Sequence, residues 1–281
     1  MQLERTVAEP GIHPTAIVHE SAEIPESVQI GPYAVIGPDV VLGEAVQIGS
    51  HAVIERDTHV GDDCRISNGA TLGSDPQDLK YAGERTFLHV GPRTRVREFA
   101  TLNRGTAATG TTIVGPDCLI MAYAHVAHDC RIAAHVVLAN SVNLAGHVEI
   151  GEHALIGGLT GVHQFVRIGR CSMVGGASGV NKDVAPFTLV SGVPAVAFGL
   201  NRIGLRRQAF SAEAISGLRA AFRHLFRSET PTRRAAMELH ESPIPEVREL
   251  ATFVLESRRG LSRAARANEG PDPRPGRDAG S

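Results

Sequence analysis

The sequence contains no tryptophan, and aromatic residues make up only 4% of its 281 residues. So few aromatics are unusual for an ordinary β-sandwich core and leave little material for a surface that stacks nucleic-acid bases. An excess of one charge is also missing, because 28 lysines and arginines nearly balance 30 aspartates and glutamates, for a net charge of −2. We therefore expect neither nucleic acid nor an anionic membrane surface as a partner.

Long apolar stretches are absent as well. No run reaches about 18 apolar residues, so we expect no transmembrane segment. Residues 1–10 carry Glu4, Arg5 and Glu9 and have no apolar core of the kind found in secretory signals. These features predict a cytoplasmic protein.

Cysteine is scarce, and its spacing does not suggest a metal site or a disulfide framework. The four residues are Cys64, Cys118, Cys130 and Cys171. Three of them, at 64, 118 and 130, fall at one position of the repeat described next. We interpret those three as small core residues.

The dominant pattern is a six-residue repeat that runs from residue 12 to residue 180. Stepping by six from Ile12 meets isoleucine, leucine or valine at 26 of 29 positions, which excludes a coincidental helix or sandwich pattern. The exceptions are Asp78, Glu84 and Ala108. A small or β-branched residue commonly follows four places after each anchor, and glycine often follows the anchor directly. Glycine, asparagine or aspartate near each turn would supply backbone conformations that other residues resist.

Three hexads make an 18-residue coil with three flat faces, and successive coils stack residues that are 18 apart. The pattern resembles that of the hexapeptide-repeat acyltransferases, and this resemblance implies a left-handed coil. We predict a mainly β fold: a left-handed parallel β-helix over residues 11–200, followed by a C-terminal α-helical domain over 201–261. Residues 262–281, rich in proline, glycine and charge, are expected to be a disordered tail.

Two segments interrupt the repeat and are expected to loop out of the coil, at about 74–89 and 103–113. Loops on a rigid scaffold commonly carry function. In the C-terminal region, Ser211 is a predicted helix N-cap, a second helix should open at Thr230-Pro231, and a third should run from Pro245 to a stop at Gly260.

The segment 122–129 contains ionisable residues within the repeat. His125, His128 and Asp129 stand there among aliphatic and small residues. With an 18-residue coil, His128 stacks under Gly146 and then Gln164, and His125 stacks under Asn143. In the same way Asp129 stacks under His147. His163 completes a group of four histidines within about three coils. Since a β-helix offers flat faces, a site is expected between prisms, which favours a trimer with three clefts between subunits.

His128 is the candidate general base, since an unperturbed imidazole has a pKa near neutrality and can accept a proton from a sugar hydroxyl. Asp129 could fix the tautomer of the ring. The alternative is that His128 is a turn or interface histidine. For His125, His147 and His163, a structural or substrate-contact role is expected. The pair His125-x-x-His128 could also contribute to a zinc site, but zinc requires three or four converging ligands, and we predict no metal.

Several motifs together resemble the family of UDP-N-acetylglucosamine O-acyltransferases over residues 11–261. They are Gln77-Asp78-Leu79-Lys80-Tyr81-Ala82-Gly83-Glu84, Arg104-Gly105-Thr106, Ala124-His125-Val126-Ala127-His128-Asp129-Cys130, Leu144-Ala145-Gly146-His147-Val148, Ile156-Gly157-Gly158, Val162-His163-Gln164-Phe165, Val174-Gly175-Gly176 and Gly204-Leu205-Arg206-Arg207. The resemblance implies a soluble homotrimer that moves an (R)-3-hydroxyacyl chain from acyl carrier protein to the 3-hydroxyl of UDP-N-acetylglucosamine, the first step of lipid A biosynthesis. It implies no metal or redox cofactor, because the acyl group arrives on phosphopantetheine.

The resemblance also implies roles for individual residues. His128 matches the catalytic base, Asp129 its partner, and Gly146 the backbone N–H proposed to stabilise the thioester oxyanion. The matches to substrate-contact positions are Asp78, Lys80, His125, His147, His163, Gln164, Asn201 and Arg207. Gly176 matches the position that bounds the acyl groove, and glycine there favours a longer acyl chain.

The sequence departs from the family pattern at Asn103, Ile203 and Gln208, which bear on the uridine-diphosphate contacts rather than on acyl transfer. Three alternatives remain open. The first is an N-acyltransferase of the same fold acting on an amino-sugar nucleotide, the second is a zinc enzyme of the carbonic-anhydrase type, and the third is a non-catalytic β-helical scaffold.

Overall fold

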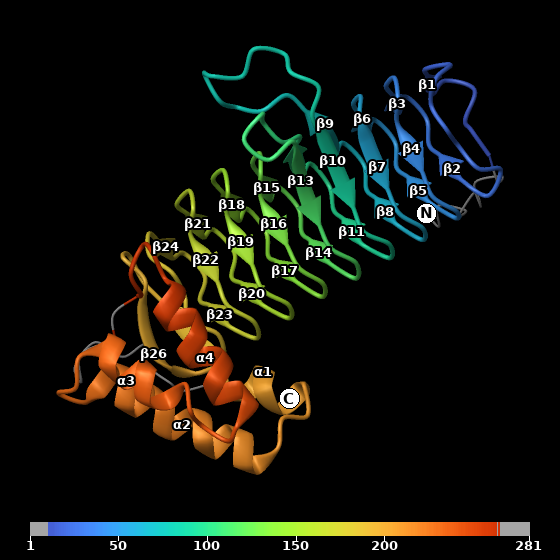
Figure 1. The fold of residues 1–281 in the computed structure, drawn as a ribbon. Coiled ribbons are helices and arrows are strands. Elements are labelled where there is room, and N and C mark those ends of the chain that lie inside the picture. Colours follow the sequence, from blue (N-terminus) through green and yellow to red (C-terminus); the bar gives the residue numbers. More distant parts are fainter. Residues whose placement is uncertain (1–10, 263, 265–281) are drawn as a thin grey trace.

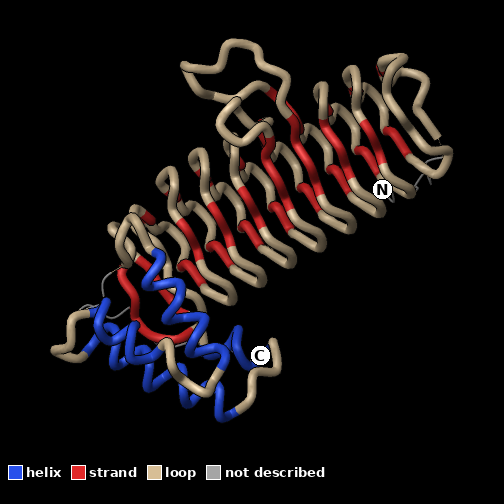
Figure 2. The backbone as a smooth tube through the Cα atoms, viewed as in Figure 1, coloured by secondary structure: helices blue, strands red, loops and turns tan. Residues whose placement is uncertain are grey.

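The computed structural model describes residues 11–262 and residue 264. These residues form a left-handed parallel β-helix, a three-sided prism of stacked coils, with a helical domain at its C-terminal end (Figure 1, Figure 2). The predicted fold class is confirmed.

Each side of the prism is one sheet. The nine-stranded sheet contains β1 (Ile17–Val18), β3 (Val35–Ile36), β6 (Val53–Ile54), β9 (Thr71–Ser74), β12 (Thr101–Asn103), β15 (His125–Val126), β18 (Asn143–Leu144), β21 (Gly161–Val162) and β24 (Gly179–Val180). The seven-stranded sheet contains β4 (Val41–Leu42), β7 (Thr58–Val60), β10 (Phe87–Val90), β13 (Thr111–Val114), β16 (Arg131–Ile132), β19 (Glu149–Ile150) and β22 (Arg167–Ile168). The ten-stranded sheet contains β2 (Gln29–Ile30), β5 (Gln47–Ile48), β8 (Arg65–Ile66), β11 (Arg95–Val96), β14 (Leu119–Ile120), β17 (Val137–Leu138), β20 (Leu155–Ile156), β23 (Met173–Val174), β25 (Thr188–Ser191) and β26 (Val196–Leu200).

The hexad anchors fill the interior of the prism, as the repeat predicts. Val126, for example, pairs with Leu102 below and Leu144 above, and all three are at most 1% exposed. The outward residues of the same strands form a parallel row, Thr101–His125–Asn143–Gly161–Gly179. The stacking of His125 under Asn143 is thereby confirmed.

The turns use a left-handed backbone conformation, but among the glycines that follow the anchors in the described residues only Gly73 (φ 80°) adopts it. Elsewhere the positive φ falls two residues later and is carried by side chains as large as Tyr33 (59°), Phe99 (58°) and Leu159 (59°). Aspartates such as Asp129 (61°) fit the expectation. Gly31 serves a different purpose, because a Cβ there would lie 3.0 Å from the Ser50 backbone nitrogen of the next coil. Apart from Gly73, the role expected for the anchor glycines was therefore wrong: they allow close coil stacking.

The two excursions are the segment 75–86 between β9 and β10 and the segment 104–110 between β12 and β13. Both are shorter than expected, since β10 already begins at Phe87 and β13 at Thr111. Both follow strands of the nine-stranded sheet, so they project from the same edge of the prism (Figure 1).

The last strand reverses direction, which the sequence did not indicate. β26 pairs antiparallel with β25 and leads into four helices: α1 (Arg202–Arg207), α2 (Ala212–Arg227), α3 (Thr232–Leu239) and α4 (Pro245–Glu256). Ser211 caps α2 through its hydroxyl, as predicted, whereas α4 ends at Glu256 rather than at Gly260. The helices share an apolar core with Cys171 and Phe187 of the β-helix.

The chain stays attached to the β-helix slightly beyond the last helix. Leu261 bridges to Asp183 and Ala264 to Ala197, while residues 265–281 of the expected tail lie outside the described residues. All four cysteines are free and buried, and burial raises the pKa of Cys130 to about 12. Within the described part of the chain, no helix has the length and apolar character needed to cross a membrane.

Candidate active site

The site is built on a turn between β15 and β16. Asp129 occupies the left-handed position of this turn and is 3% exposed. Its carboxylate accepts from Thr106, whose backbone N–H lies 3.1 Å from Oδ1 and whose hydroxyl lies 2.7 Å from Oδ2. The Thr109 hydroxyl donates to Oδ1, and His128 Nδ1 lies 2.7 Å from Oδ2. Burial opposes ionisation, but these hydrogen bonds outweigh it and hold the pKa of Asp129 below its usual range.

An ionised Asp129 can only accept hydrogen bonds, so His128 Nδ1 must carry the proton. This leaves the lone pair of the neutral ring on Nε2. The ring lies against Gly146 of the next coil, where a Cβ would be 2.6 Å from Nε2 and 2.4 Å from Cε1. Among the described residues no acceptor is found for the Gly146 N–H. A glycine at position 146 therefore gives an incoming group access to both a lone pair and a free donor.

His147 completes the buried part of the site. Its ring packs edge-on to His128, with centroids 5.1 Å apart, and stacks on Phe165 at 4.4 Å. Its Nε2 lies 3.6 Å from Asp129 Oδ2. Burial lowers the pKa of His147, although the nearby Asp129 carboxylate partly offsets that effect. A neutral His147 can position a substrate without competing for the Asp129 charge.

His125 projects from β15 onto the outer face of the sheet. Its Nδ1 lies 2.7 Å from the Thr101 hydroxyl, and burial followed by the neighbouring His128 lowers its pKa. His163 and Gln164 lie two coils further on, and both are exposed. His125, His128, Gly146, His163 and Gln164 border one cleft of about 810 Å³ along the row of outward residues.

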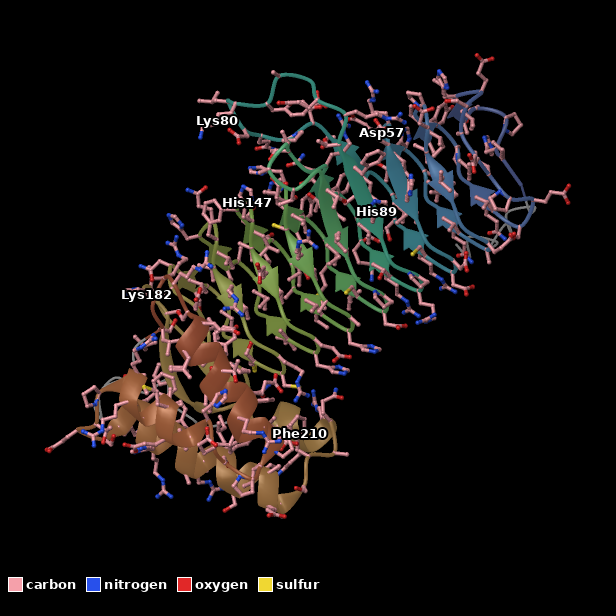
Figure 3. The ribbon with its side chains drawn as sticks, in the orientation of Figure 1. Asp57, Lys80, His89, His147, Lys182 and Phe210 are labelled. Atoms are coloured by element: carbon pink, nitrogen blue, oxygen red, sulfur yellow. The ribbon has the colours of Figure 1, made fainter. Side chains whose placement is uncertain are left out.

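The first excursion reaches the rim of this cleft. Gln77 lines it, and Asp78 is close enough to influence the charge state of His147. Asp78 also accepts from the Lys80 backbone N–H at 3.0 Å, which forms a local turn. Lys80 lies on the projecting loop, on the side of the prism that carries His147 (Figure 3).

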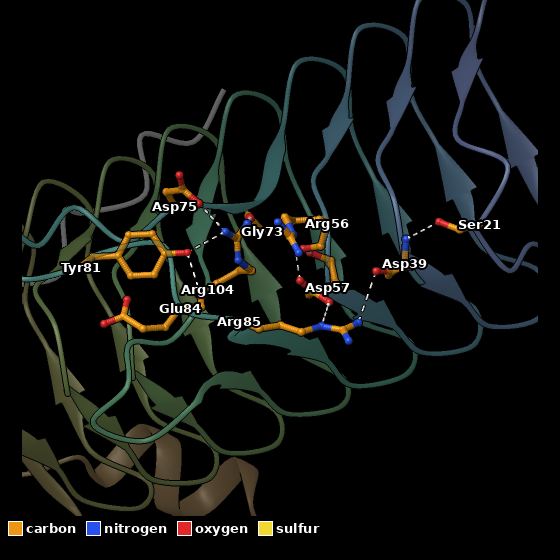
Figure 4. Close-up of polar contacts among 11 residues, drawn as sticks. Ser21, Asp39, Arg56, Asp57, Gly73, Asp75, Tyr81, Glu84, Arg85 and Arg104 are labelled. Atoms are coloured by element: carbon orange, nitrogen blue, oxygen red, sulfur yellow. Dashed lines mark hydrogen bonds and ion pairs between the residues drawn. The ribbon is translucent and has the colours of Figure 1, made fainter.

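Arg104 holds that excursion in place from the second one (Figure 4). Its side chain is 3% exposed, and its guanidinium donates to the Gly73 carbonyl, to the Asp75 carboxylate and, at 3.2 Å, to the Tyr81 hydroxyl. Asn103, next to it, is also buried and donates to Ser74 Oγ at 2.8 Å. Asn103, where the sequence departs from the family pattern, therefore helps to anchor the loop. Its buried side chain is not placed as an exposed nucleotide contact would be.

Segment 104–109 therefore positions both the first excursion and the Asp129 carboxylate. Arg104 fixes the loop that carries Asp78 and Lys80, and two residues later Thr106 fixes Asp129. Sequence reasoning missed the part played by Thr106 and Thr109, because their contacts cross the irregular loops and follow no period. Their position after Arg104-Gly105 was the one available signal.

Not every predicted site residue joins this cleft within one chain. Asn201 and Arg207 border a separate cavity of about 390 Å³, together with Ile203 and Gln208. Asn201 is 9% exposed, and its side chain caps α1 through Gly204 N at 3.0 Å and donates to the Cys171 carbonyl at 2.9 Å. Its groups are thus already engaged in the fold of the chain.

Gly176 also lies away from His128. It follows β23, on the turn that leads into β24, and the turn that holds His128 lies at the other edge of the nine-stranded sheet. A Cβ at Gly176 would lie 3.2 Å from the Gly158 carbonyl oxygen. Positions 158 and 176 themselves therefore place no side chain at this edge of the sheet.

The His125-x-x-His128 pair does not converge as a zinc site would require. The compact group here is instead His128, Asp129 and His147, whose donor atoms all lie within 4.8 Å of one another. Both oxygens of Asp129 are already occupied by hydrogen bonds from threonines and His128. This arrangement suits proton transfer better than metal ligation.

The comparisons with known proteins agree with this geometry. Three segments, residues 21–56, 39–74 and 111–146, match the model of the bacterial transferase hexapeptide repeat. Residues 183–262 match the model described as UDP N-acetylglucosamine O-acyltransferase, domain 2. Fold and site together thus define a transferase of the hexapeptide-repeat class.

Full-length relatives specify the family. The chain is 48% identical to the acyl-[acyl-carrier-protein]–UDP-N-acetylglucosamine O-acyltransferase of Burkholderia orbicola and 44% identical to that of Thiobacillus denitrificans, covering 90% of this chain and 99% of each relative. It belongs to the UDP-N-acetylglucosamine O-acyltransferase family. The solved structure of the Moraxella catarrhalis O-acyltransferase superposes with a TM-score of 0.87 at 44% identity, over 90% of this chain and 99% of that one. The Francisella novicida acyltransferase gives 0.89 at 35%, over 92% and 95%.

Proposed function

We propose that this protein transfers an (R)-3-hydroxyacyl chain from acyl carrier protein to the 3-hydroxyl of UDP-N-acetylglucosamine, the first step of lipid A biosynthesis. The observation that carries the proposal is the 2.7 Å contact between His128 Nδ1 and Asp129 Oδ2, which directs Nε2 toward the cleft beside Gly146. The names of the full-length relatives support the substrates.

In this reaction His128 Nε2 removes the proton from the sugar hydroxyl as the oxygen attacks the thioester carbonyl carbon. The Gly146 N–H donates to the oxyanion that forms. When the intermediate collapses, the C–S bond breaks and the imidazolium returns the proton to the departing phosphopantetheine thiolate. Asp129 stabilises the imidazolium between the two steps. Every proton and electron pair is accounted for by these groups and the two substrates, so the reaction needs no metal or redox cofactor.

Substrate contacts are proposed for Asp78, Lys80, His125, His147, His163 and Gln164. Asn201 and Arg207 border another cavity of the same chain, so their part in nucleotide binding requires a neighbouring subunit. We therefore propose a homotrimer with clefts between subunits. Its working partner is acyl carrier protein, and its compartment is the cytoplasm.

The acyl chain is proposed to run along the row of outward residues toward Gly176. Gly161 and Gly179 in that row have no side chains, and a Cβ at Gly161 would meet no atom within 4 Å. Glycine at 176 likewise adds no side chain at the far edge. These features favour a longer acyl chain over a short one.

The test is mass spectrometry of the product formed by the purified full-length chain from a mixture of (R)-3-hydroxyacyl carrier-protein thioesters. The acceptors are UDP-N-acetylglucosamine and, in parallel, its 3-amino counterpart. The expected product is an ester of UDP-N-acetylglucosamine with one preferred chain length. An amide formed only with the amino sugar would establish the N-acyltransferase instead, and transfer to neither acceptor would refute the proposal.

A further inference from the structure

A second histidine cluster lies on a different edge of the prism, away from the cleft. His135 and His153 occupy the same turn position on successive coils, with φ of 59° and 57°. Their backbone N–H groups donate to the Pro116 and Ala134 carbonyls of the preceding coils, at 3.0 and 3.1 Å. The rings stack with centroids 4.6 Å apart and an interplanar angle of 3°. Coil stacking thus sets the spacing of two imidazoles.

Glu152 supplies a carboxylate beside this pair, with Oε1 3.6 Å from His153 Nε2. Donor atoms of His135, Glu152 and His153 all lie within 4.8 Å of one another. In the described part of the chain, this group and the His128–Asp129–His147 group are the two that reach such compactness. Two imidazoles and one carboxylate form a recognised ligand set for zinc.

The two groups differ in whether their donor atoms are free. Asp129 is saturated by hydrogen bonds. Among the described residues, by contrast, the side chains of His135, Glu152 and His153 make no hydrogen bond. Their ring nitrogens and carboxylate oxygens are therefore available to coordinate an ion.

We propose that His135, Glu152 and His153 bind a divalent transition-metal ion, with Zn²⁺ as the probe of choice. The side chains of His153 and Glu152 are 24% and 46% exposed, so an ion can enter from solvent. The nearby cation Arg170 is neutralised by Glu249, at 2.8 Å. Three protein ligands leave a coordination position for water. Both histidines also border the cavity that contains Arg207.

This site is separate from the cleft that contains His128, and the proposal does not depend on the proposed function. The experiment is a competition titration of Zn²⁺ into the chelator-treated, full-length protein at pH 7.5, with a chromophoric chelator as reporter. We expect saturable binding that fails at pH 5.5, because the ligands must be deprotonated. His153→Asn and Glu152→Gln should each weaken binding by about tenfold or more.

Two controls make the assignment specific. His89→Asn alters another surface histidine pair, His59–His89, whose centroids are 4.7 Å apart, and should leave binding unchanged. His147→Asn tests the other compact group and should leave the site at 135–153 intact. The melting temperature without metal checks that each variant is folded. Absence of saturable binding, unchanged affinity in His153→Asn, or loss of all binding in His147→Asn alone would each overturn the proposal.

Discussion

Thr106 holds both oxygens of the Asp129 carboxylate, with its backbone N–H on Oδ1 and its hydroxyl on Oδ2. Oδ2 is also the oxygen that meets His128 Nδ1. The threonine therefore fixes the orientation of the carboxylate, and through it the orientation of the imidazole. Because Thr106 touches no proposed reacting atom, its role is one of positioning.

Thr106→Val tests that role. The substitution keeps the shape and the backbone N–H but removes the hydrogen bond from the hydroxyl to a charged acceptor. Such a bond contributes roughly 1.5 kcal/mol, so kcat should fall about tenfold with little change in the KM for the sugar nucleotide. Thr111→Val is the matched control, since in the described part of the chain that hydroxyl donates only to the adjacent Thr112 carbonyl. Equal effects of the two substitutions would contradict the assignment.

His128→Ala should abolish turnover while the fold is retained. Loss of a general base costs about a hundredfold to ten-thousandfold in rate. Circular dichroism and the melting temperature should stay close to wild type, because the interior anchors are untouched. His19→Ala, at an exposed position, should retain full activity. Residual activity near the wild-type level in His128→Ala would show that His128 is not the general base.

Gly146→Ala should inactivate the enzyme, because the added methyl group would clash with the His128 ring. A Cβ would sit 2.4 Å from Cε1 of a ring that Asp129 holds in place. A displacement of about 1 Å at a catalytic group can cost a hundredfold in rate, and we expect kcat to fall by that order. Gly199→Ala, where a Cβ meets nothing within 4 Å, is the control. If the two variants turn over equally fast, His128 is not constrained as described.

Arg104→Gln should act mainly on substrate binding. The change removes the contacts to Asp75 and Tyr81 that hold the first excursion, so the KM for the sugar nucleotide should rise by about tenfold. A larger effect on kcat than on KM would show that the arginine acts through Asp129 instead. Arg93→Gln, which breaks an exposed ion pair with Asp117, should leave both constants unchanged.

Stability should decrease as the pH falls from 7.5 to 5.5. Burial is the main cause that places the pKa of His125 and His147 below the ordinary value of 6.5. The folded state therefore favours the neutral rings, and their contribution is present above pH 6.5 and is lost as the pH falls through the folded pKa. The urea unfolding midpoint of the wild type should drop over this range, and His147→Gln should drop less. A steeper drop in His147→Gln would reverse the assigned sign.

Sequence periodicity predicted the β-helix because each coil repeats one local rule: an aliphatic anchor such as Val126 inside and an outward neighbour such as His125. The same rule found His128 and Asp129, since the 18-residue stacking placed Gly146 and His147 next to them. It failed where contacts leave the repeat. Thr106 reaches Asp129 from an irregular loop, and the reversal at β26 follows no hexad.

Asn201 illustrates a different limit. A family motif suggested a substrate contact, whereas an asparagine directly before a helix is also a common N-cap. Local helix chemistry accounts for its side chain in this chain, through Gly204 N and the Cys171 carbonyl. Only the coordinates could show that both ends of this amide are hydrogen-bonded within the chain.

The row Thr101–His125–Asn143–Gly161–Gly179 also means that the length of the cleft can change only by whole coils. Each coil adds about 4.8 Å along the prism, so lengthening or shortening the row itself, as opposed to a loop such as the two excursions, must add or remove whole 18-residue coils. Such changes alter the cleft only in large, equal increments. Any finer adjustment to the size of a bound chain must therefore come from single side chains along the row, and positions 161 and 179, now glycine, are where that adjustment can still be made.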